Sequence, residues 1–217
     1  MNRRTLLLGI SGAAAIAVTG GWIASRNAGT QTSFALPAAA DESAEILPDI
    51  PMGDPNAPIT LIEYASYTCP HCANFHDTVF GKLKTDYIDT GKVKFIHREV
   101  YFDKYGLWAG LIAQCGGAPK YHALSGMIYE TQKDWIGDGK DATIADNLRK
   151  IGLKAGLGKE QIDACMADQG RMSAMIATYQ KNATADDINS TPTLVIDGVK
   201  HSNMSYDELT AILDAKL

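Results

Sequence analysis

Two short hydrophobic runs flank an amphipathic segment between residues 59 and 100. Residues 59–64 are β-branched, apolar and aromatic for the most part, in a run short enough for a buried strand. Residues 73–87 carry apolar side chains at helical spacing, and Gly91 supplies the left-handed residue that ends a helix. Residues 92–100 alternate between apolar and polar positions. The pattern predicts a strand–helix–strand unit with parallel strands and a right-handed connection.

The pattern changes between residues 104 and 185, where the apolar spacing is helical and glycine-containing breaks separate the segments. A strand-like run returns at residues 193–196. A two-residue turn, Asp-Gly, then leads into residues 199–201, which predicts a β-hairpin. Ser205 and Glu208 have the spacing of a capping box, and they predict a final helix over residues 206–216.

The order βαβ, helical block, ββα predicts an α/β protein with a thioredoxin fold and a helical domain inserted in its middle. The predicted first part of the thioredoxin-like domain covers residues 59–103, and its second part covers residues 186–217. The inserted helical domain is predicted over residues 104–185. Residues 41–58, which contain four prolines, are predicted to be a lead-in.

The first forty residues have a different composition from the rest. Arg3 and Arg4 precede a largely apolar run over residues 6–24, and no acidic residue appears before Asp41. A short basic segment followed by an apolar stretch is typical of an export signal, so residues 1–40 are predicted to direct the protein to the periplasm. The adjacent arginines also resemble a twin-arginine signal. A cleaved signal is the favoured interpretation, and an uncleaved anchor formed by residues 6–24 is the alternative.

Composition and charge narrow the classes of partner. With 46% hydrophobic and 21% charged residues, the chain resembles an ordinary globular protein. Cleavage after residue 40 removes three arginines and no acids, which takes the formal charge from −5 to −8. This negative balance argues against nucleic acid and anionic membrane surfaces as partners. Disulfides persist outside the cytoplasm, so the four cysteines are candidates for bridges before they are candidates for metal ligands.

Cys69 and Cys72 are separated by two residues and lie between the first predicted strand and its helix. A pair with this spacing is either redox-active or half of a zinc site, and a structural zinc site needs four ligands. The other two cysteines, Cys115 and Cys165, are 50 residues apart. A helix N-terminus favours a thiolate through its free N–H groups and its dipole. We therefore predict a redox pair without metal or cofactor, with Cys69 as nucleophile and Cys72 as the buried resolving thiol.

The two residues between the cysteines fit the same role. Pro70 suits the first turn of a helix, where its missing N–H costs little. His71 is predicted to place a polar ring, cationic when protonated, near the Cys69 sulfur, and a solvated loop histidine is the alternative. Each pKa unit by which the thiolate is favoured corresponds to about 1.4 kcal/mol. Stabilising the reduced form in this way makes the disulfide a stronger oxidant.

Residues 63–72, Glu-Tyr-Ala-Ser-Tyr-Thr-Cys-Pro-His-Cys, resemble the active site of the DsbA family of periplasmic dithiol oxidases. The lead-in at residues 53–58 and the Thr-Pro-Thr sequence at 191–193 with its closing hairpin resemble the same family. The resemblance covers about residues 50–217. It implies a nucleophilic thiol of low pKa and a strongly oxidising pair.

The resemblance also implies roles for residues outside the cysteine motif. Pro192 is expected to be a cis-proline that faces the cysteines, and Thr191 is expected to bind substrate peptide through its backbone, although trans is the default for proline in general. Glu63 matches the buried acid of the family, which is thought to help proton transfer at the resolving thiol. A surface-facing glutamate at a strand end is the alternative.

Cys115 and Cys165 are expected to form a structural disulfide, a feature that resembles one subgroup of the family. Closing a loop of 50 residues corresponds to about 4 kcal/mol of stabilisation. Two free buried thiols and a second exchange-active pair are the alternatives.

The sequence therefore predicts an oxidase that donates its Cys69–Cys72 disulfide to unfolded exported proteins. By resemblance, a quinone-linked membrane partner reoxidises the pair. The rivals within enzymes are a disulfide isomerase and a reductase of the same fold. Isomerases of this type carry an added dimerisation domain, for which residues 41–58 are too short. A peptide-binding chaperone with incidental thiols is the rival from another class, and a zinc-binding module is the third.

Overall fold

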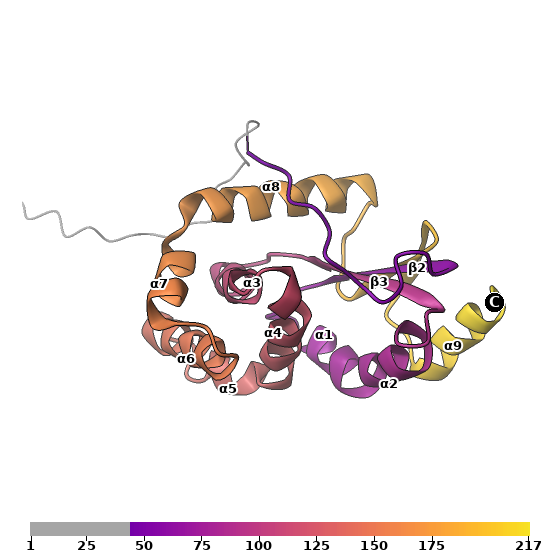
Figure 1. Ribbon diagram of the computed structural model, residues 1–217, viewed down its shortest axis with the longest axis horizontal. Coiled ribbons are helices and arrows are strands. Elements are labelled where there is room, and N and C mark those ends of the chain that lie inside the picture. The colour runs from indigo at the N-terminus through magenta and orange to yellow at the C-terminus, as the bar shows by residue number, and fades with distance from the viewer. Residues whose placement is uncertain (1–43) are drawn as a thin grey trace, which may run out of the picture. The chain divides into compact units, whose positions relative to one another are not determined.

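In the computed structural model, which describes residues 44–217, a five-stranded sheet is covered by helices on both faces (Figure 1). The predicted export signal over residues 1–40 and the alternative anchor over 6–24 lie outside the described residues. Among residues 44–217, no helix is both long enough and apolar enough to cross a membrane.

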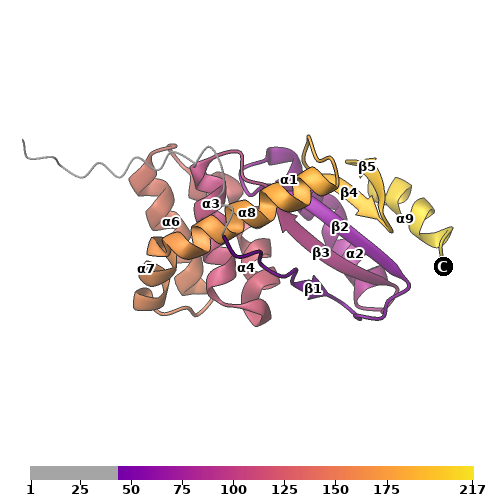
Figure 2. The same ribbon diagram turned by 90° about the horizontal axis from the view of Figure 1, so that it is seen from above.

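The strands follow the spatial order β1-β3-β2-β4-β5, which Figure 2 shows from above. Their bounds are Pro51–Met52 for β1, Ile59–Ala65 for β2, Val93–Glu99 for β3, Thr193–Ile196 for β4 and Val199–Ser202 for β5. The β2–β3 pair is parallel, as the βαβ pattern predicts, and the other pairs are antiparallel. The thioredoxin fold with a helical insertion is confirmed.

The helical elements agree with the pattern in type and order. They are α1 (Pro70–Phe75), η1 (His76–Phe80), α2 (Gly81–Leu83), η2 (Lys84–Ile88), α3 (Lys104–Cys115), α4 (Ala118–Glu130), α5 (Gln132–Ile136), α6 (Asp141–Lys154), α7 (Lys159–Ala167), α8 (Gln169–Ala185) and α9 (Tyr206–Asp214).

The helix after β2 begins earlier than its apolar pattern indicates. The pattern predicts residues 73–87, whereas α1 starts at Pro70 because Cys69 already occupies the N-cap position. The helix then continues through η1, α2 and η2 to Ile88, with η1 and η2 in π-helical conformation. Turns of this wider kind are rare inside helices and are frequent at functional sites.

A second difference lies in the predicted lead-in. Residues 51–52 pair with Ile96 and Phe95 and form the short edge strand β1. Gly53 follows with φ of 93°, and a Cβ atom there would come within 2.8 Å of the Val93 carbonyl oxygen. Only glycine combines this backbone conformation with so close an approach.

Two apolar clusters hold the sheet between its helices. In Figure 1, α1, α2 and α9 lie below the sheet, and α8 runs above it. The lower cluster joins strand residues to these helices, for example Leu61 with Phe75 and Leu209. On the upper face Tyr64 packs in a cluster with Tyr179 of α8. A third cluster fills the space between the helices α3 to α7, and it includes both Cys69 and Cys72. The cysteine pair therefore lies where the inserted helices meet the sheet.

The closing elements form as their local sequence predicts. Asp197 and Gly198 have φ values of 47° and 83°, the conformation of a type I′ hairpin turn. Ser205 accepts a hydrogen bond from the backbone of Glu208, whose side chain accepts one from the Ser205 backbone. This capping box starts α9.

Candidate active site

The backbone places Cys69 at the N-cap of α1 with Pro70 in the first turn. The amide groups of Cys72 and Ala73 donate to the Cys69 carbonyl oxygen at 3.1 and 3.2 Å. The Cys69 residue itself is extended, with φ of −80° and ψ of 119°. This geometry directs the Cys69 sulfur toward the free amides that begin the helix.

The two thiols are free and differ in environment. Cys69 retains 9% of its surface, whereas Cys72 is completely buried. A hydrogen bond from Cys72, together with hydrogen bonds from Thr191 and from the backbone of Cys72 and His71, lowers the pKa of Cys69 to about 5 against the effect of burial. The hydrogen bond to Cys69, burial and the negative charge of Glu63 raise the pKa of Cys72 well above its ordinary range.

Thr191 and Pro192 lie opposite the pair, in the loop before β4. The peptide bond between them is cis. The Cys69 sulfur lies 3.5 Å from the Thr191 carbonyl oxygen. This contact agrees with the expectation from the sequence that the loop faces the cysteines.

His71 is exposed, and its backbone amide is the part of the residue that lowers the Cys69 pKa. The predicted effect of its ring on the sulfur stays a prediction.

A glutamine from the helical block holds the cysteine loop. The Gln132 side-chain amide donates to the Tyr67 carbonyl at 2.8 Å and to the Cys69 carbonyl at 3.0 Å. Gln132 is buried at the start of α5, so these bonds tie the inserted helices to the backbone of Cys69.

Glu63 lies on β2 and is completely buried, which excludes the surface-facing alternative. One carboxylate oxygen, Oε2, is 3.0 Å from Nε2 of His76, and the other, Oε1, has no hydrogen-bond partner. A buried carboxylate oxygen without a partner is costly, so it is unusual in a purely structural residue.

His97 lies beside Glu63 on the neighbouring strand. Its Nδ1 is 2.8 Å from the Tyr121 hydroxyl and its Nε2 is 3.0 Å from the Tyr129 hydroxyl. Burial lowers the pKa of His97 well below its ordinary value, which favours the neutral ring. Tyr121 in turn donates to the buried Glu99 at 2.8 Å.

Glu63, His76 and His97 each offer a potential metal ligand, and these atoms lie within 4.8 Å of one another. These ligand atoms are, however, already hydrogen-bonded: Nε2 of His76 bonds the Glu63 carboxylate, and both nitrogens of His97 bond tyrosine hydroxyls. The arrangement is that of a hydrogen-bonded network.

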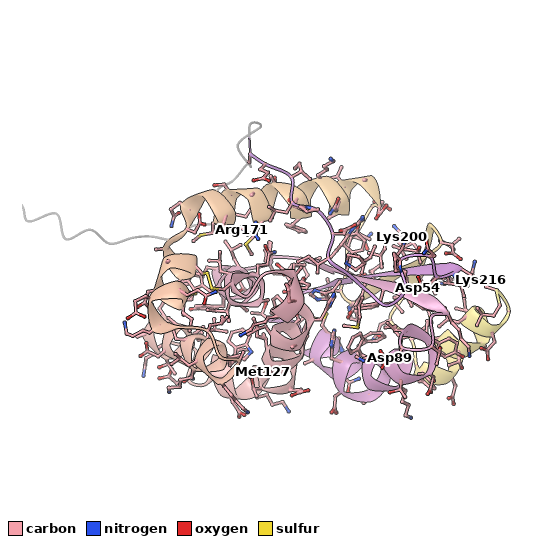
Figure 3. The ribbon with its side chains drawn as sticks, viewed as in Figure 1. Asp54, Asp89, Met127, Arg171, Lys200 and Lys216 are labelled. Carbon is pink, nitrogen blue, oxygen red and sulfur yellow. A yellow bond between two sulfur atoms is a disulfide. The ribbon has the colours of Figure 1, made fainter. Side chains whose placement is uncertain are left out.

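Cys115 and Cys165 are bonded to each other, with an S–S distance of 2.07 Å. Figure 3 shows this bond in yellow beside α7. It joins the end of α3 to α7, and it leaves neither sulfur available to complete a four-thiolate zinc site with Cys69 and Cys72.

Comparison with known families agrees with this geometry. A family model described as Thioredoxin matches residues 46–215. The chain belongs to the thioredoxin family. Alpha-DsbA1 of Wolbachia pipientis, a solved structure, has a TM-score of 0.71 and 29% identity, and the match covers 82% of this chain and 95% of that one. The resemblance to the DsbA family is thereby confirmed.

Relatives of similar sequence carry names that refer to disulfide chemistry. A putative protein-disulfide oxidoreductase of Rickettsia bellii is 31% identical over 167 residues, which make up 76% of this chain and 63% of the relative. Disulfide bond formation protein D of Bacillus subtilis is 25% identical over 178 residues, 76% of either chain. This chain spans less than two thirds of the length of the Rickettsia protein.

Two contributors to this thioredoxin-family site were missed by sequence reasoning. His76 was given no role in the exchange reaction, although its position four residues after Cys72 puts it one helical turn further along the helix. Gln132 gave no signal, because the contact to Cys69 spans 63 residues and depends on how α5 packs.

Proposed function

We propose that this chain is a protein dithiol oxidase, which donates its Cys69–Cys72 disulfide to proteins that carry pairs of thiols. The observation that carries the proposal is the opposite displacement of the two thiol pKa values, down to about 5 for Cys69 and upward for Cys72. A stable Cys69 thiolate favours the reduced protein, and so makes its disulfide a strong oxidant.

The exchange takes place in two steps. A substrate thiolate attacks the Cys69 sulfur, the bond between Cys69 and Cys72 breaks, and its electron pair goes to the Cys72 sulfur, which takes up a proton. A second substrate thiolate then attacks the substrate sulfur of the mixed disulfide, and Cys69 leaves as a thiolate. Two substrate thiols are thus oxidised to a disulfide and the cysteine pair is reduced. Low pKa makes Cys69 the better leaving group in the second step.

The loop at Thr191 and Pro192 is the proposed binding surface for the substrate backbone. Its contact with the Cys69 sulfur places any peptide bound along it beside the reacting disulfide. Glu63 is the proposed proton donor and acceptor for Cys72, because its charge already acts on that thiol.

The relatives named protein-disulfide oxidoreductase and disulfide bond formation protein support the same chemistry. We infer that the substrates are unfolded exported proteins, that residues 1–40 direct or anchor the chain outside the cytoplasm, and that a quinone-linked membrane protein reoxidises the pair. Catalysis needs no metal and no cofactor in this proposal.

The reduction potential of the Cys69–Cys72 pair tests the direction of exchange. We expect equilibration with glutathione to give a potential well above the approximately −270 mV of thioredoxin. The oxidised protein should also convert a peptide with two thiols to its disulfide stoichiometrically, whereas Cys69→Ser should not. A potential near that of thioredoxin would instead indicate a reductase. Full cellular function of Cys69→Ser would indicate a peptide-binding chaperone.

A substrate with several mismatched disulfides separates oxidase from isomerase. The oxidase should add disulfides to the reduced substrate and leave the mismatched ones unchanged.

A further inference from the structure

The resolving thiol is isolated from solvent, although the proposed reaction changes its protonation. Cys72 is completely buried, and so is Glu63, whose charge acts on it. A thiolate that leaves into this interior is costly without a proton. A proton given up by Glu63 must in turn be replaced from water, which Glu63 does not reach.

His76 is the connection between Glu63 and the surface. Among residues 44–217 it is the only hydrogen-bond partner of the Glu63 side chain, at 3.0 Å between Nε2 and Oε2. The His76 side chain retains 7% of its surface, against none for Glu63. It also lines a pocket of about 490 Å³, together with Pro70, Ala73 and Asn74 of the cysteine-bearing helix.

The surroundings hold the imidazole in place. Tyr129 of α4 stacks on it with ring centroids 4.0 Å apart and an angle of 20° between the planes, and Phe80 lies at 4.7 Å. A ring fixed in this way keeps its Nε2 hydrogen-bonded to Glu63 while another part of the ring lines the pocket.

Several ionisable groups face His76 from the elements that pack on it. They are Glu63 on β2, His97 on β3, Tyr129 on α4 and, in the pocket, Asp77, Glu130, Lys133 and Asp134. His97 is the other imidazole near Glu63, but both of its nitrogens are engaged with tyrosine hydroxyls. An imidazole can accept and donate a proton in the neutral pH range, which makes His76 the suitable carrier.

We propose that His76 relays protons between water in this pocket and Glu63, and so supplies the proton that the Cys72 sulfur takes up when the disulfide opens. The inference rests on the proposed oxidase function. When the Cys69–Cys72 bond breaks, the Glu63 carboxylate accepts a proton from the His76 imidazolium and passes it to the Cys72 sulfur. Pocket water then reprotonates the imidazole. Reoxidation runs the same transfers in reverse.

The test measures how fast a peptide with two thiols reduces the oxidised protein in a single turnover, from about pH 5 to pH 8. His76→Gln keeps a donor for Glu63 but has no proton to exchange, and His76→Ala opens space beside the pocket. We expect both to be slower by about 100-fold, the lower end of what a positioned acid or base contributes. Added imidazole should restore His76→Ala by at least about tenfold, and should restore neither His76→Gln nor Glu63→Gln.

His201→Gln is the matched control, because this half-buried histidine lies on the edge strand β5 and has no part in the network. It should react at the rate of the unmodified protein. His76→Gln at that same rate across the pH range would overturn the relay, and so would a slow His76→Ala that imidazole leaves unchanged. Failure of the unmodified protein to oxidise the peptide would instead refute the proposed function.

Discussion

The carbonyl oxygen of Thr191 lies 3.5 Å from the sulfur of Cys69, across a separation of 122 residues. The side chain of Thr191 also forms a hydrogen bond that lowers the pKa of Cys69. The loop that faces the pair therefore tunes the Cys69 thiol as well as contacting it. The proposed binding of substrate and the tuning of this thiol meet in one residue.

Replacing Thr191 by valine keeps the shape of the side chain and removes its hydroxyl group. A hydrogen bond to a charged group is worth about 1.5–3 kcal/mol, and one pKa unit about 1.4 kcal/mol. We therefore expect the pKa of Cys69 to rise by about one unit. Titration of the reduced protein, with the thiolate absorbance recorded against pH, measures this change. Thr193→Val should leave it unchanged, because the Thr193 hydroxyl donates to the Ser190 carbonyl at 2.8 Å. Equal midpoints for Thr191→Val and the unmodified protein would contradict the role.

The stability of the reduced protein should depend on pH differently from that of the oxidised protein. The pKa of Cys69 falls from 9.0 to about 5 on folding, so between these values the unfolded reduced chain holds one more proton than the native one. Stability of the reduced form therefore rises with pH, by up to about 1.4 kcal/mol per unit. At pH 7 the gain is about 3 kcal/mol, and it is lost as the pH falls to 5.

Denaturant unfolding of both forms at pH 5, 6, 7 and 8 measures this gain as a difference. Groups other than the two thiols occur in both forms and largely cancel. A difference that stays constant over this range would show that Cys69 titrates near its ordinary value.

Loss of the Gln132 side-chain amide should loosen the cysteine loop. Gln132→Leu leaves the buried Tyr67 carbonyl without this donor and removes one donor from Cys69. We expect the free energy of unfolding to fall by about 1–3 kcal/mol. Denaturant unfolding of the oxidised protein measures the change, and Gln169→Leu at an exposed position of α8 serves as control. Equal losses for the two variants would show that the hydrogen bonds of Gln132 contribute nothing.

Removing the disulfide between Cys115 and Cys165 should affect stability and leave exchange chemistry intact. The bond closes a loop with a separation of 50 residues, and the double variant Cys115→Ala/Cys165→Ala should lose about 2–4 kcal/mol. The thiolate titration of Cys69 and the rate of peptide oxidation should stay unchanged. A changed potential of the Cys69–Cys72 pair would support the alternative of a second, exchange-active pair.

Features that depend on near neighbours could be predicted from the sequence. The hairpin at Asp197 and Gly198 needs only two residues that tolerate positive φ, and the start of α9 needs only Ser205 and Glu208. The same is true of the helix N-terminus at Cys69, which requires a strand, a turn and a proline in series. The order of these elements was sufficient for the thioredoxin fold, since few topologies accommodate βαβ followed by ββα.

The sequence by itself thus determined the elements and their order, and it singled out Cys69 and Cys72 as the pair proposed to react. Only the tertiary structure decided that His76 reaches Glu63, that Gln132 holds the backbone of Cys69, and that Thr191 contacts its sulfur. Capping, turns and periodicity act over a few residues, so they leave a trace in the local sequence. The hydrogen bonds that tune Cys69 and connect Glu63 to the surface join side chains from separate elements. They exist only once packing has brought those elements together.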